Sequence, residues 1–136
     1  MKTILFLFAS TICFSQTISK APIYEDANLT ITELEYGFIY FGGQDSDYTL
    51  IIQIVSFSLR NKTDAIALID KAISMLGMEK TEVDQTISDK FQKLNLTRYG
   101  FAQNKIHFSW LKDGVYVSLN PFNLQELENI KAALSK

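Results

Sequence analysis

The dipeptide Asp113-Gly114 restricts the fold of this chain more than any other feature of its sequence. A two-residue hairpin turn needs positive φ at both central positions, and Asp-Gly is a favoured pair there. A turn at these residues fixes the pairing of its flanking strands: Lys112 with Val115, Leu111 with Tyr116, Trp110 with Val117, Ser109 with Ser118, Phe108 with Leu119, and His107 with Asn120. One face of this hairpin is apolar and the other is mostly polar, which is typical of a sheet covered on one side.

Three further strands are predicted around this hairpin. A second tight turn at Gln103-Asn104 would extend it into a meander over 92–120. That turn would add two apolar pairs to the same face: Phe101 with Ile106, and Tyr99 with Phe108. Earlier in the chain, 31–41 and 48–59 are rich in β-branched and aromatic residues, and the turn-forming segment 42–47 lies between them. This arrangement predicts another hairpin.

Two amphipathic helices are also predicted. Asn61 or Thr63 can cap the start of the first helix, and Gly77 can supply a left-handed residue at its end. Asn123 can cap the second helix, and Glu126 then completes a capping box. The buried stripes recur at helical spacing: Ile66, Ile69, Ile73 and Leu76 in the first helix, and Leu124, Leu127, Ile130 and Leu134 in the second.

The predicted fold is therefore α+β. It is a two-layer structure with one antiparallel sheet of about five strands, in the order ββαβββα, and two helices packed on one face. The polar, acidic segment 79–90 is expected to be a loop, and 16–30 an irregular lead-in. Residues 31–136 are expected to form a single domain.

The first 15 residues, 1–15, have the pattern of a secretory signal peptide. Lys2 supplies a positive charge, 4–14 is mainly apolar, and the small Cys13 and Ser15 precede a cleavage point before Gln16. Cleavage would remove the only cysteine, so no disulfide would support the mature domain. We therefore expect export to the bacterial periplasm or the extracellular medium, with no transmembrane segment after signal cleavage.

The composition disfavours several kinds of site. A structural zinc ion needs four Cys or His ligands, and the expected mature chain offers only His107. The sequence Asp45-Ser46-Asp47 resembles the start of a calcium loop, but no glycine follows it, so a solvated hairpin tip is expected. Loss of Lys2 would change the formal net charge from −2 to about −3, which disfavours a nucleic-acid partner. No metal, cofactor or nucleic acid is expected.

One set of residues allows a catalytic interpretation. His107, Ser109 and Ser118 share the polar face of the last hairpin in the predicted pairing, with Arg98 beside them. A working Ser–His pair also needs an orienting acid and an oxyanion site, and neither is evident on this face. A small periplasmic or secreted hydrolase using His107 with Ser109 or Ser118 is therefore the alternative function. The simpler interpretation is a solvated polar sheet face.

An aromatic stripe points towards binding. Tyr36, Phe38 and Tyr40 alternate on one face of the strand predicted over 31–41. If the helices cover the opposite face, the stripe joins Leu111 and Tyr116 as an exposed apolar interaction surface. The pattern does not determine which face the helices cover. If they cover this face, the stripe is part of the core instead.

The function expected from these observations is that of a small exported, non-catalytic binding or protein-interaction module. Its partner would be a protein, a peptide or a small apolar ligand. An apolar edge strand would also allow a homodimer to form by edge-strand pairing.

Overall fold

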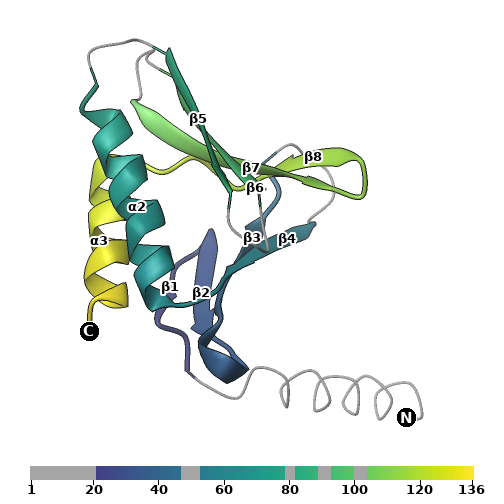
Figure 1. Ribbon diagram of the computed structural model, residues 1–136, viewed down its shortest axis with the longest axis vertical. Coiled ribbons are helices and arrows are strands. Elements are labelled where there is room, and N and C mark those ends of the chain that lie inside the picture. The colour runs from purple at the N-terminus through teal and green to yellow at the C-terminus, as the bar shows by residue number, and fades with distance from the viewer. Residues whose placement is uncertain (1–20, 47–52, 79–81, 89–92, 100–103) are drawn as a thin grey trace.

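The structure, a computed structural model, describes residues 21–46, 53–78, 82–88, 93–99 and 104–136. The chain passes through two successive halves, each with four strands followed by a helix (Figure 1). The first half contains β1 (Tyr24–Glu25), β2 (Leu29–Glu33), a 3-10 helix η1 (Glu35–Gly37), β3 (Ile39–Gln44), β4 (Ile54–Leu59) and α2 (Lys62–Leu76). The second half contains β5 (Glu82–Ser88), β6 (Lys93–Tyr99), β7 (Lys105–Lys112), β8 (Val115–Ser118) and α3 (Leu124–Leu134).

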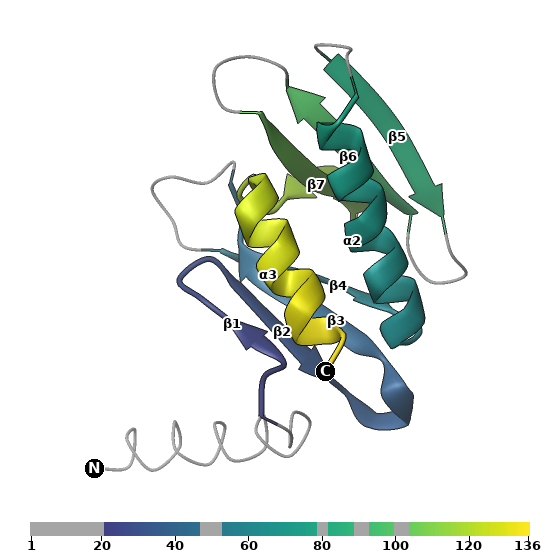
Figure 2. The same cartoon turned by 90° about the vertical axis from the view of Figure 1, so that its left-hand side faces the viewer.

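Each half forms its own four-stranded antiparallel meander, with strand orders β1-β2-β3-β4 and β5-β6-β7-β8. The two helices lie side by side and cover one side of the sheets (Figure 2). The predicted α+β class with antiparallel strands is thus confirmed. The single sheet of about five strands in the order ββαβββα is wrong, because there are two sheets of four strands each. β1 and β5 were not predicted, and β2 was predicted only as part of the strand over 31–41.

The sequences of β1 and β5 are short or mostly polar and lack the strong alternation of apolar residues that predicts a strand. The expected lead-in 16–30 is wrong for its second part, where β1 and β2 pair across a turn. The Asp26 Oδ1 atom stabilises that turn by accepting the backbone N–H groups of Asn28 (2.7 Å) and Leu29 (2.9 Å). The expected loop 79–90 is wrong as well, since β5 pairs with β6 along its whole length. Main-chain pairing alone reveals β5, whose sequence is mostly polar.

The hairpin at Asp113-Gly114 is confirmed. Both residues have positive φ, 51° and 81°, and the four predicted pairs from Lys112–Val115 to Ser109–Ser118 are all present. Beyond Leu119 the register shifts by one residue, because Pro121 has no N–H and Phe122 pairs with Ile106 in its place.

The register predicted between β6 and β7 is wrong. Tyr99 pairs with Lys105, and Leu96 pairs with Phe108. The observed pairing places the buried Leu96 beside the buried Phe108, whereas a two-residue turn at Gln103-Asn104 would have shifted the strands by three residues. The predicted partner Phe101 lies outside the described residues.

The first predicted hairpin is confirmed as a pair of strands but not in its details. Phe41 pairs with Phe57, as β3 and β4 run antiparallel. The strand predicted over 31–41 is interrupted by η1, where Tyr36 has a φ of 62°. The turn predicted at 42–47 is wrong for its first residues, because β3 continues to Gln44.

An aromatic cluster joins the two sheets. Phe57 of β4 stacks on Phe41 with ring centroids 4.8 Å apart. Its ring also makes edge contacts with two residues of β7, Trp110 at 5.1 Å and Phe108 at 6.4 Å. Phe122, which precedes α3, packs on Phe108 at 5.4 Å. Aromatic pairs of this kind each contribute about 0.5–1.5 kcal/mol beyond the burial of their area.

A second connection, which we call the sheet seam, consists of Gly43, Asp45, Ser46, Ser118 and Leu119. Asp45 pairs with Leu119, and the Ser46 N–H donates to the Ser118 carbonyl at 2.9 Å. The hydroxyl oxygens of Ser46 and Ser118 lie 2.5 Å apart. Asp45 is only 1% exposed, so the solvated hairpin tip expected at this residue is wrong. At the seam, the residue that follows β3 pairs with the residue that follows β8, so the two sheets are joined through their main chains.

Both predicted helix starts are confirmed. The Asn61 Oδ1 atom accepts the Asp64 N–H at 2.8 Å, and the Asn123 Oδ1 atom accepts the Glu126 N–H at 2.9 Å. Of the predicted stripe residues, Leu124 is exposed and the others are buried or packed against the core. The left-handed end predicted at Gly77 is wrong, because this residue has a φ of −83°.

Arg98 supplies the polar contacts at the end of α2. Its guanidinium donates to the carbonyl of Met75 at 3.3 Å and to the carbonyl of Met78, and its Nε donates to Asn104 Oδ1 at 2.8 Å. The carbonyls at a helix C-terminus lack helical partners and carry partial negative charge, so a cation is stabilising there. Arg98 therefore faces α2 and not His107, contrary to the prediction.

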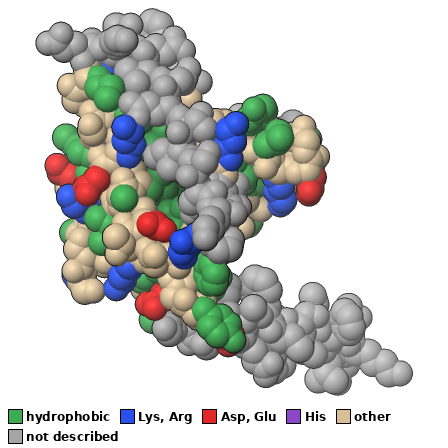
Figure 3. All heavy atoms as spheres, in the orientation of Figure 1, with side chains coloured by type: hydrophobic (Ala, Val, Ile, Leu, Met, Phe, Trp, Pro, Cys, Tyr) green, Lys and Arg blue, Asp and Glu red, His purple; other side chains and the backbone are tan. Residues whose placement is uncertain are grey.

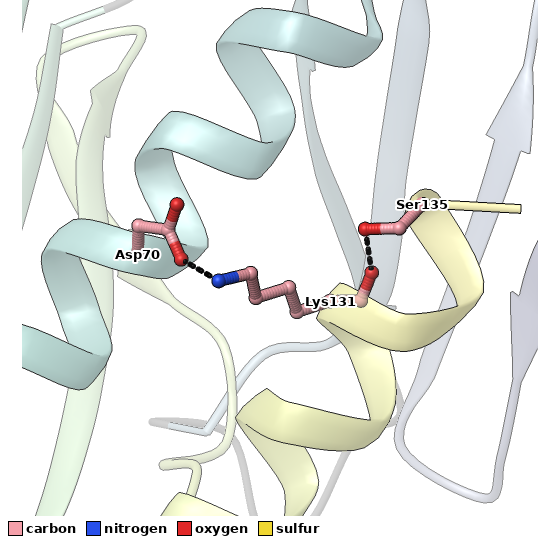
Figure 4. Close-up of polar contacts among 3 residues, drawn as sticks. All are labelled: Asp70, Lys131 and Ser135. Carbon is pink, nitrogen blue, oxygen red and sulfur yellow. Dashed lines mark hydrogen bonds and ion pairs between the residues drawn. The ribbon is translucent and has the colours of Figure 1, made fainter.

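The two helices are joined by a surface ion pair. Lys131 Nζ of α3 lies 2.6 Å from Asp70 Oδ1 of α2 (Figure 4). Near the end of α3, the Ser135 hydroxyl donates to the Lys131 carbonyl at 2.8 Å. Both ion-pair side chains are about half exposed, so the pair contributes at most about 1 kcal/mol.

Gly43→Ala should destabilise the protein by about 1–3 kcal/mol through overpacking. A Cβ at this position would lie 2.4 Å from the Asn28 carbonyl oxygen and 2.9 Å from Leu119 Cδ2. Gly77→Ala is the matched control, since its Cβ would meet only the Ser74 carbonyl at 3.6 Å. Urea denaturation should show a lower free energy of unfolding for Gly43→Ala and an unchanged one for Gly77→Ala. Equal free energies of unfolding for the two variants would contradict the close contact at the seam.

Arg98→Met should lower the free energy of unfolding by about 1.5–3 kcal/mol, because it removes charge-assisted bonds to the end of α2. Lys131→Met removes only the exposed ion pair and should cost about 1 kcal/mol or less. Urea denaturation of both variants measures the difference. A larger loss for Lys131→Met would show that the helix end does not depend on Arg98.

Candidate functional site

The end of the β7–β8 hairpin exposes three apolar side chains. Leu111, Val115 and Tyr116 are 56, 55 and 63% exposed. We call residues 111–116 the hairpin tip. It extends away from the two helices (Figure 1), and hydrophobic side chains gather on it beside basic and acidic ones (Figure 3).

The tip is exposed because the core ends one pair earlier. Trp110 and Val117 form the last buried pair of the hairpin. Leu111 and Tyr116 are the next pair and point to the opposite face, since successive strand residues alternate. Val115 lies on the same face as Trp110 but beyond the core. The tip therefore carries apolar side chains on both of its faces.

The predicted interaction surface is divided between two places. Leu111 and Tyr116 form a cross-strand pair in the hairpin tip. Tyr36 is 93% exposed, but it belongs to η1, which lies far from the tip (Figure 1). Phe38 and Tyr40 follow η1 and are half-buried. The stripe is thus neither a fully buried part of the core nor continuous with the tip.

Tyr40 lines an open groove of about 560 Å³ on the first sheet. The groove lies between the β1–β2 turn and β3, and Gly42 and Gly43 contribute main chain to it. The sequence pattern did not predict this groove, because the turn at Asp26 was not recognised and Gly42-Gly43 was interpreted only as a turn. Gln44 and Ile54 also line the groove, and they pair across β3 and β4.

The residues of the catalytic alternative lie on the second sheet. Ser109 pairs with Ser118, and His107 lies two residues before Ser109 on β7, opposite Thr97. Ser118 is only 7% exposed and its hydroxyl lies 2.5 Å from that of Ser46, so it is part of the sheet seam. None of the three residues lines the groove. The arrangement therefore gives the Ser118 hydroxyl a structural role.

Within the described ranges, no group of three or more His, Cys, Asp or Glu side chains is placed to hold a metal ion. In the same part of the chain, no helix is long and apolar enough to cross a membrane.

One titratable side chain beside the groove has a shifted pKa. Burial is the largest cause, and together with the hydrogen bond to Asp26 and the negative charges of Asp26 and Glu126 it raises the pKa of Tyr24 to about 12. The Tyr24 hydroxyl donates to Asp26 Oδ2 at 2.6 Å. The Asp26 carboxylate thus receives hydrogen bonds at both of its oxygens, from the hydroxyl and from the turn.

This shift predicts a loss of stability in alkali. The pKa of Tyr24 is 10.0 when unperturbed and about 12 in the folded protein, so the hydroxyl ionises more readily in the unfolded chain. The stability it contributes is complete below pH 10 and is lost as the pH rises towards 12. Urea denaturation measures this loss. As the pH rises from about 9 to about 11, the free energy of unfolding should fall less for Tyr24→Phe than for the wild type. Tyr36→Phe, at an exposed position, should show the same dependence of the free energy of unfolding on pH as the wild type. A free energy of unfolding that does not change with pH in the wild type would contradict the raised pKa of Tyr24.

In comparisons with protein-family models, curated proteins and solved structures, nothing matched this chain. What the chain does must therefore be inferred from the geometry and chemistry of its described residues.

Proposed function

We propose that this chain is a small exported, non-catalytic binding module and that the hairpin tip is its contact surface. The observation that supports this most directly is the presence of three apolar side chains, each more than half exposed, on both faces of a projecting hairpin. Exposed apolar side chains that cluster in this way are typical of protein contacts.

The energetics support the hairpin tip as a contact surface. Burying Leu111, Val115 and Tyr116 against a partner would contribute roughly 1–2 kcal/mol for each side chain. The antiparallel pairing holds Leu111 and Tyr116 opposite each other, and the buried Trp110 anchors the strand directly before them. A preorganised anchor loses less conformational entropy on binding than a mobile loop does.

The partner we propose is a protein with a concave site, because apolar groups on both faces of a hairpin are best covered by a surface that surrounds it. A second copy of the chain is a variant of the same proposal, with β8 as the pairing strand at the edge of its sheet. Export is supported by the signal-like residues 1–15 and the absence of cysteine from 16–136.

The hydrolase alternative has weaker support. The Ser118 hydroxyl is engaged at the sheet seam, and Ser109 lies on a sheet face away from the groove. His107 does not line the groove on the first sheet, and such chemistry needs a concave, water-excluding site.

The proposal predicts that Leu111→Ser/Tyr116→Ser abolishes association without unfolding the domain. Native mass spectrometry of the chain recovered from its host's envelope and medium should show a mass above that of 16–136 for the wild type. The double variant should appear as the bare chain, with an unchanged melting temperature, because neither side chain belongs to the core.

The matched control is Tyr36→Ser/Leu124→Ser, which removes the same two residue types from exposed positions outside the hairpin tip. This control should retain the added mass. Loss of the added mass in the control variant would contradict the proposed contact surface. Recovery of the wild type only as the bare chain would contradict it as well.

A further inference from the structure

The groove on the first sheet has an aromatic floor. Tyr40 and Gly42 lie on the same face of β3, opposite to the face on which Phe41 packs against Phe57. A Cβ on Gly42 would lie 2.6 Å from both Cε1 and Oη of Tyr40. The Tyr40 ring therefore lies close against Gly42, and both residues line the groove.

The rim of the groove is polar, and the Asp26 carboxylate is the one charged group among its described residues. Asp26 is the one carboxylate among the described lining residues, and no Lys, Arg or His is among them. Its two oxygens already accept hydrogen bonds from Tyr24 and from the turn. The remaining polar side chains of the rim are neutral: Asn28, Thr30 and Gln44.

A ligand that matches this lining has an apolar face and several neutral hydrogen-bonding groups. The face of a tyrosine ring carries partial negative charge and attracts the weakly positive C–H groups on one face of a saturated ring. Amide and hydroxyl side chains both donate and accept hydrogen bonds, which suits hydroxyl groups on a ligand. The volume of about 560 Å³ lies within the range for small-molecule sites, roughly 300–1,000 Å³.

We propose that this groove binds a neutral sugar, with its ring stacked on Tyr40 and its hydroxyls bonded to Asn28, Thr30 and Gln44. The site is separate from the hairpin tip, because it lies on the first sheet and shares no residue with 111–116. An anionic sugar would be disfavoured by the Asp26 carboxylate and by the lack of a cation in the described lining.

The test is isothermal titration of the full mature chain with three neutral probes, maltotriose, cellotriose and chitotriose, and with one anionic probe, trigalacturonate. At least one neutral probe should bind saturably at millimolar concentration or below, and more tightly than the anionic probe. Tyr40→Ala should weaken that binding about tenfold, as expected for loss of an aromatic contact. Tyr36→Ala, outside the groove, should leave it unchanged.

Absence of binding by all three neutral probes would overturn the proposal, as would tighter binding of trigalacturonate or an equal loss in Tyr36→Ala. If Tyr40→Ala lowers the melting temperature, Gln44→Ala takes its place, since Gln44 is on the rim and not in the core. It should weaken binding severalfold, and an unchanged affinity would overturn the proposal. Variants of the hairpin tip should bind the sugar like the wild type.

Discussion

The contact of Phe57 with Trp110 and Phe108 holds the two halves of the chain together. It is the aromatic link between a residue of the first half and the central strand of the second half. Two separate four-stranded sheets, each with one helix, would each leave an apolar face uncovered. By sharing one core, the halves cover both faces, with the helices side by side over the same region.

The shared core also determines which residues remain available for binding. The second sheet is buried as far as Trp110 and Val117, and the hairpin continues for one more pair and a turn. The exposure of Leu111 and Tyr116 follows from this extra length. On the first sheet, the consecutive glycines allow Leu119 to approach Gly43 and Tyr40 to lie close against Gly42. The seam and the groove thus share one short segment of β3.

Local signals predicted local structure well. Asp113-Gly114 fixed its hairpin because positive φ is required there, and Asn61 and Asn123 predicted both helix starts through their side-chain oxygens. Long-range pairing was not predictable in the same way. The polar β5 is recognised only by its partner β6, and the buried Asp45 only by its contact with the end of β8. Of the predicted interaction surface, Leu111 and Tyr116 lie together because they share one hairpin, whereas Tyr36 was misplaced because η1 breaks the alternation.

We propose that the hairpin tip is the surface through which this chain binds its partner. Site-specific photo-crosslinking in the cells that make the protein tests it most directly, with the photoreactive residue placed at position 116 or at position 36. Both positions are exposed, so their reactivity towards solvent is comparable. Our account predicts a discrete crosslinked product from position 116 and none from position 36. A product from position 36 alone, or no product from either position, would contradict it.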